Sequence, residues 1–207
     1  MSIDLEASLP RAIPLAAVLI AARSTLADLV GVEVAPELDV AVDRRYERGR
    51  RVAAGRHLHG AELMSTTIGD PIARDTDGSP AAIHYEIDIA GYHDGVRLMV
   101  IDHAPETGGE VEAVFSPYRT CVSVVVATAL ALAAAELGGG TFIDEQIRML
   151  RPGGTVPRDV VMTTRLPPEQ GDFVTGCERY LRQFPHLGDW PRDVSMPVRT
   201  SNIPPPS

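Results

Sequence analysis

Histidine and carboxylate side chains gather on two neighbouring predicted strands and in the turn between them. His84, Asp102 and His103 fall on the strands, and His93 and Asp94 fall in the turn. Histidine titrates near neutral pH, and a carboxylate can fix its tautomer, so this set has the residue types of a general base. Solvent-facing residues of an antiparallel sheet produce the same pattern. Both interpretations stay open at this point.

An acidic strip lies on the polar side of the same predicted strands. Its members are Glu86, Asp88, Glu110 and Glu112. Residues two apart on a strand share a face, and a face rich in carboxylates attracts a basic partner. We therefore take these four as candidate partner-binding residues, although ordinary solubility also explains an acidic strip.

Two other polar clusters precede these strands. HLHGAE places His57 and His59 two residues apart with Glu62 close by, so a metal site and a polar hairpin edge are the alternatives. The run RRYERGRRVAAGRH, residues 44–57, holds six arginines that would bind a phosphate or an acidic protein, or would simply be solvated on a hairpin. The known catalytic and nucleotide-binding motifs are missing. We assign no catalytic residue, no metal and no cofactor.

The strands that position these residues are predicted from alternation. Residues 82–115 alternate apolar and polar side chains around GYHDG and one further break, which predicts a three-stranded antiparallel meander. The same pattern predicts strands at residues 2–6, 37–43 and 141–146. A further strand is expected from Val160 to Leu166.

Three helices are predicted from apolar spacing and end signals. They cover residues 12–30, 117–137 and 172–184, with Ser116 and Asp172 as the caps of the second and third. The middle helix is apolar nearly all round, which indicates burial on several sides. Its uncharged stretch is too short and too rich in alanine to span a bilayer. The fold class is therefore α+β, with the meander packed against the helices 12–30 and 117–137.

Composition narrows the classes of partner and the compartment. A net charge of −9 argues against general nucleic-acid binding. Cys121 and Cys177 lie at apolar helix positions, so free buried thiols and a cytoplasmic address are expected. All nineteen basic residues are arginine, as in GC-rich, actinobacterial-like sequences. We expect one domain over residues 1–184 and a Pro-rich extended tail over residues 185–207, anchored by Trp190.

One segment resembles a known family. The run ALALAAAELGGGTFIDEQ, in the region of residues 128–145, leads a small-residue helix through three glycines into a short strand that ends at Asp144. It resembles a pattern in bacterial immunity proteins encoded beside polymorphic secreted toxins. The resemblance implies a cytoplasmic protein that occludes the active site of a cognate toxin, and it transfers no catalytic residue.

Two other function classes remain as alternatives. One is a small hydrolase or transferase that uses His84 and His103 in a pocket beside the meander. The other is a homo-oligomeric structural or adaptor protein, such as a dimer, that packs through a partly exposed helix 117–137. A protein that binds a basic partner is the leading hypothesis.

Overall fold

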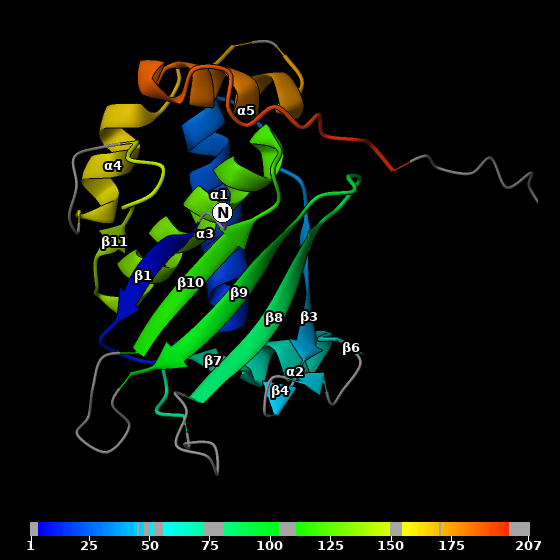
Figure 1. Ribbon diagram of the computed structural model, residues 1–207, viewed down its shortest axis with the longest axis vertical. Coiled ribbons are helices and arrows are strands. Elements are labelled where there is room, and N and C mark those ends of the chain that lie inside the picture. Colours follow the sequence, from blue (N-terminus) through cyan, green and yellow to red (C-terminus); the bar gives the residue numbers. More distant parts are fainter. Residues whose placement is uncertain are drawn as a thin grey trace, which may run out of the picture.

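The computed structural model places a seven-stranded antiparallel sheet in front of a layer of helices (Figure 1). It describes residues 4–44, 46–47, 50–51, 56–72, 81–103, 111–149, 155–169 and 171–198. The strand order is β11 (Phe142–Ile143), β1 (Leu5–Leu9), β10 (Val111–Pro117), β9 (Gly95–Asp102), β8 (Ala81–Ile89), β3 (Leu38–Arg44) and β6 (Arg56–His57). The α+β fold class predicted from the sequence is confirmed.

The predicted meander forms the centre of this sheet. Its strands are β8 (Ala81–Ile89), β9 (Gly95–Asp102) and β10 (Val111–Pro117). In β8, Tyr85, Ile87 and Ile89 are buried against the helices, while the residues between them point to the other face. Alternation therefore identified both the strands and their buried side.

Strands from distant parts of the chain extend the meander on both sides. On one side β1 (Leu5–Leu9) pairs with β10, and β11 (Phe142–Ile143) pairs with β1. On the other side β3 (Leu38–Arg44) pairs with β8, and β6 (Arg56–His57) pairs with β3. The predicted strand at 37–43 is confirmed, whereas the one at 2–6 is shifted towards Leu9.

Short elements complete the described chain. They are β2 (Ile13–Pro14), β7 (Thr67–Ile68), β4 (Tyr46–Glu47), β5 (Arg50–Arg51), the helix α2 (Gly60–Ser65) and the 3-10 turn η1 (Pro185–Leu187). β2 pairs with β7, and β4 pairs with β5 within the arginine run, where the sequence allowed either a hairpin or an irregular connection.

Two long helices cover one face of the sheet. α1 (Leu15–Val30) and α3 (Cys121–Gly138) pack against each other behind the strands (Figure 1). α3 is the one helix, among the residues that the structure describes, long and apolar enough to cross a membrane, with a mean hydropathy of 2.0. Because 89% of it is buried inside the protein, it is the core helix that its composition predicted.

The triple glycine after α3 allows the chain to return tightly to the sheet. Gly139 ends the helix in the left-handed conformation with φ +72°. A Cβ at Gly140 would lie 2.0 Å from the backbone oxygen of Ser8, so only glycine fits there. Asp144 then closes the next turn by accepting three backbone N–H groups at 2.7–3.0 Å, from residues 147–149. This conspicuous sequence motif therefore has a structural role.

Two sequence predictions are wrong: the strand at residues 160–166 and the capping residue of the second helix. Residues 160–166 do not form a strand: α4 (Pro157–Thr164) is a helix whose buried residues Pro157, Val160 and Thr164 lie at helical spacing. Its β-branched residues suggested a strand, but Pro157 at the first turn and the packing of α4 on α3 override that preference. The predicted cap Ser116 lies in β10 instead, and Thr120 caps α3 by accepting the Ser123 N–H at 3.0 Å.

The third predicted helix is α5 (Phe173–Arg182), and Asp172 is its cap as expected. After η1 the chain crosses the end of the sheet in an extended form. Ser195 donates a hydrogen bond to the buried Asp94, which also accepts from Thr120 at 2.8 Å and Ser123 at 3.2 Å. This carboxylate therefore joins the tail, the β8–β9 turn and the start of α3.

Candidate functional site

The sheet has one face against the helices and an opposite face towards the viewer in Figure 1. Its centre is apolar, because Met99, Ile101 and Val114 lie side by side on β9 and β10. Met99 and Ile101 are half-buried, and Val114 is almost fully covered by its neighbours. No described helix crosses this face, which we call the open face.

Carboxyl groups surround the apolar centre. By the register of the strands, five acidic and one arginine side chain of the described set point outward: Glu6, Asp39, Glu86, Asp88, Glu112 and Arg97. Asp39 lies directly opposite Asp88, a like-charge pair that does not stabilise a sheet. The open face is therefore acidic beyond what sheet stability requires.

The structure brings together three of the four predicted partner-binding residues. Glu86, Asp88 and Glu112 share the open face, as their parity predicted. Asp88 is exposed, whereas the side chains of Glu86 and Glu112 are 18% and 22% exposed. Glu110 lies outside the described residues.

Glu86 is held in place by two neighbours. The Tyr118 hydroxyl donates to its Oε1 at 2.6 Å, and the Arg97 guanidinium lies 3.8 Å from its Oε2. Burial, followed by this hydrogen bond to a carboxylate, raises the pKa of Tyr118 to about 12. Tyr118 therefore keeps its proton and remains a donor to Glu86 at neutral pH.

The opposite end of the open face holds a linked chain of three groups. His103 Nε2 lies 2.7 Å from Glu112 Oε2, and Glu112 lies diagonally beside Glu6 of the neighbouring strand. Burial, the bond to Glu112 and the nearby carboxylates raise the pKa of Glu6 to about 7. This end of the face therefore carries less negative charge near neutral pH than its composition suggests.

The histidine pair proposed for catalysis is not assembled. His84 pairs with Met99 in the ladder, four positions from His103, and strand residues are about 3.3 Å apart along the axis. Asp102 points to the other face, is buried and accepts the Ile72 N–H at 3.1 Å, so it cannot orient His103. The cavity beside the meander, about 240 Å³, is lined by Ile83, Tyr85 and Val100 from that inner face.

The other clusters are occupied by local contacts. The rings of His57 and His59 stack with centroids 5.8 Å apart, while Glu62 pairs with Arg56 at 2.5 Å. Among the side chains that the structure describes, no three potential ligands gather as they would around a metal ion. Half of the arginine run, residues 45, 48–49 and 52–55, lies outside the described residues.

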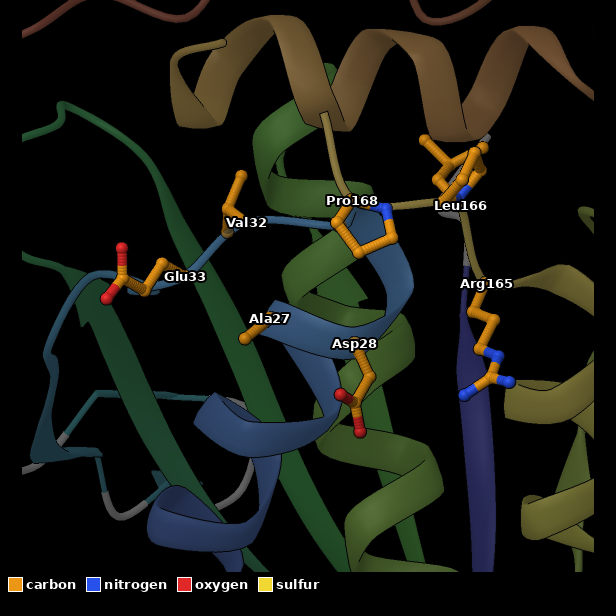
Figure 2. Close-up of a pocket in the computed structure, with 9 residues that line it drawn as sticks. Ala27, Asp28, Val32, Glu33, Arg165, Leu166 and Pro168 are labelled. Carbon is orange, nitrogen blue, oxygen red and sulfur yellow. The ribbon is translucent and has the colours of Figure 1, made fainter. Parts of the chain in front are cut away.

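A larger hollow, of about 660 Å³, lies at the end of α1 against the α4–α5 connection. Its charged lining residues are Asp28, Glu33 and Arg165, and Figure 2 shows them spread along the hollow rather than converging on one point. Gly31 allows this connection to lie close to α1, because a Cβ at Gly31 would be 2.6 Å from the backbone oxygen of Pro167. The hollow is therefore a seam between two elements without a convergent polar site.

The fold and the open face define a class of molecule, an α+β domain whose sheet presents an acidic surface. Comparisons with protein-family models, with curated proteins and with solved structures found no match. The geometry of the open face therefore carries the functional argument.

Sequence reasoning missed Glu6 and Asp39 as members of this face. The signal was present in LEASL, where Leu5, Ala7 and Leu9 alternate with polar residues. The local sequence does not show that this strand pairs with β10, which lies more than one hundred residues later in the chain. That pairing places Glu6 next to Glu112.

Proposed function

We propose that this protein binds a basic protein partner through the open face, in the manner of a bacterial immunity protein that occludes a toxin. The observation that carries the proposal is a sheet face that no described helix covers, with an apolar centre and five outward carboxyl groups against one described guanidinium. Such a surface supplies apolar contact at its centre and attraction for positive charge around it.

The resemblance of residues 128–145 to immunity proteins supports the same proposal. Two buried free thiols, Cys121 and Cys177, agree with a cytoplasmic address, where such a protein would protect its host. The acidic rim would raise the association rate, so added salt should slow association more than it speeds dissociation.

The alternatives fit the geometry less well. Two copies of the chain meeting face to face would bring like charges together, which opposes a dimer through this surface. α3 is buried on nearly every side, so the exposed apolar helix that an adaptor role required is not present there. The register separates His84 from His103 along the sheet, which favours the binding proposal over a hydrolase or transferase that uses both residues in one pocket.

Co-expression with the product of the adjacent gene tests the proposal. We expect the two proteins to purify as a complex, and we expect Asp39→Arg/Asp88→Arg to weaken it at least about tenfold, since charge reversal at an interface replaces attraction by repulsion. This double variant exchanges one exposed like-charge pair for another, so the fold is little affected.

A matched control carries the same charge change on the helical layer. Glu136→Arg/Glu178→Arg alters two exposed residues of α3 and α5, away from the open face. The control should bind as the wild type does. Equal weakening by both variants, or no complex with the wild type, would contradict the proposal.

A further inference from the structure

The cavity beside the meander, of about 240 Å³, lies between the inner face of the sheet and the chain from β7 onwards. Apolar side chains make most of its wall. Ile68 and Ile72 come from β7 and the segment after it, and Ile83 and Val100 come from β8 and β9. Ile83 and Val100 are paired in the ladder, and Tyr85 follows Ile83 on the same face. The cavity therefore lies on the side of the sheet away from the open face.

Contacts at both ends fix the segment that closes this cavity. At one end β7 pairs with β2 through Ile68, and at the other the Ile72 N–H donates to the buried Asp102 at 3.1 Å. Between these contacts Gly69 has φ +94°, and a Cβ there would lie 2.9 Å from the backbone oxygen of Arg11. The cavity is therefore a defined part of the fold.

One polar group in the wall of the cavity has an unused hydrogen-bonding capacity. Tyr85 is only 4% exposed, and no residue that the structure describes forms a hydrogen bond with its hydroxyl. Burial raises the pKa of Tyr85, so the hydroxyl keeps its proton and can donate. Thr67 and Asp70, at the exposed rim, bind each other instead. A buried hydroxyl without a partner is costly, which points to a bound group that accepts from it.

The size and polarity of the wall define what fits. A buried water molecule needs about two to four polar partners, so a wall with one free hydroxyl suits a mostly apolar ligand better. An apolar cavity of about 150 Å³ accepts benzene, so by proportion one of about 240 Å³ accepts a molecule of about ten non-hydrogen atoms. Ile83 is 37% exposed although it faces the same side as the buried Tyr85, so the cavity is accessible from solvent beside it.

We propose that this cavity is a binding site for a small apolar molecule with one hydrogen-bond acceptor, such as an aryl ketone, whose oxygen accepts from the Tyr85 hydroxyl. The isoleucine and valine side chains cover the apolar part of the ligand, and the hydroxyl fixes its orientation. This site goes beyond the proposed function, because it uses the opposite side of the sheet and none of the residues of the open face.

Acetophenone, an aryl ketone of about the expected size, is the probe for the test. α-Methylstyrene is its matched control, because a methylene group replaces the ketone oxygen and the shape is kept. Both are titrated into the wild-type protein, and their affinities are measured from changes in its amide NMR spectrum. We expect both to bind, since the wall is largely apolar, and only the ketone to depend on the Tyr85 hydroxyl.

Tyr85→Phe removes the proposed donor and keeps the ring. The affinity for acetophenone should fall about fivefold, as expected for one neutral hydrogen bond, while the affinity for α-methylstyrene should not fall. Without ligand, Tyr85→Phe should unfold at a temperature no lower than the wild type, because no described residue loses a hydrogen bond.

Ile83→Trp places a large side chain at the opening of the cavity and should abolish binding of both probes. Ile20→Trp makes the same change on the exposed side of α1, where Ile20 is 68% exposed, and should leave both affinities unchanged.

Several results would overturn this inference. They are no binding of acetophenone to the wild type, a loss in Tyr85→Phe that is absent or equal for both probes, and binding that survives in Ile83→Trp. A large loss of stability in ligand-free Tyr85→Phe would also overturn it, because the hydroxyl would then have a partner within the fold. None of these results bears on the complex with the adjacent gene product, so the two proposals fail separately.

Discussion

The raised pKa of Glu6 predicts how the stability of the free protein depends on pH. The ordinary pKa of Glu6 is 4.5, and in the folded state it is about 7. Because the folded protein holds this proton more tightly than the unfolded chain, the contribution is fully present below pH 4.5. It is lost as the pH rises through 7. Replacing Glu6 by Gln removes the titration while keeping a neutral side chain of the same shape.

The size of the effect follows from the pKa difference. Each unit corresponds to about 1.36 kcal/mol, so the difference between 4.5 and about 7 sets an upper bound of about 3.4 kcal/mol. Glu6 is only half-buried, and solvent screening reduces this to about 1 to 2 kcal/mol. We expect the free energy of unfolding of Glu6→Gln, relative to wild type, to rise by that amount between pH 4.5 and pH 8.

Urea denaturation at several pH values measures this difference. Glu178→Gln serves as the control, because it removes an exposed carboxylate elsewhere and should show a nearly flat difference. A flat difference for Glu6→Gln would mean that folding does not raise the pKa of Glu6. A difference that falls with rising pH would refute the sign of the argument.

Three further substitutions test the contacts that hold the fold behind the open face. Asp94→Ala should lower the free energy of unfolding by about 3 to 4 kcal/mol in urea, because three hydroxyl groups lose a buried acceptor. Asp144→Ala removes the acceptor of three backbone N–H groups and should cost about 2 to 4 kcal/mol by the same measurement. Gly140→Ala forces a methyl group into the β1 backbone and should lower the thermal midpoint by an amount corresponding to about 3 kcal/mol or more.

Each of these has a result that would contradict it. Asp94→Ala should also make the segment after η1 more sensitive to protease, so unchanged cleavage would mean that Asp94 does not hold the tail. Asp144→Asn keeps one acceptor oxygen and should lose less stability than Asp144→Ala. Gly171→Ala is the control for Gly140, since a Cβ at Gly171 meets nothing within 4 Å. Similar losses for both glycines would argue against the close approach.

The parts of the fold that were predicted correctly carry strong local signals. The meander alternates over whole strands, and α3 is apolar over nearly all of its length, so both are recognisable without their neighbours. α4 was wrongly predicted as a strand because Val160, Val161 and two threonines favour strands, whereas its Pro157 and its buried spacing favour a helix. Tertiary packing on α3 decides between these preferences.

Half of the outward charged residues of the open face were predicted from the sequence in the same way. Glu86, Asp88 and Glu112 were placed on one face by strand parity alone, since a period of two follows from backbone geometry. The same reasoning left open whether His84 and His103 form a catalytic set or lie apart on a solvent-facing sheet, and the register places them apart. The parity of a strand residue predicts which face of the sheet its side chain points to. It does not predict which residue of the neighbouring strand lies opposite, because that depends on the register.

Local pattern therefore determines which residues of this protein face water and which face its core, because burial acts on each short segment directly. Only the tertiary structure brings Glu6 of the first strand beside Glu112 of the tenth and places the helices that the structure describes away from one side of the sheet. Both depend on contacts between segments far apart in the chain, whose order in the sheet no local preference encodes. The acidic surface and the raised pKa of Glu6 are products of that order.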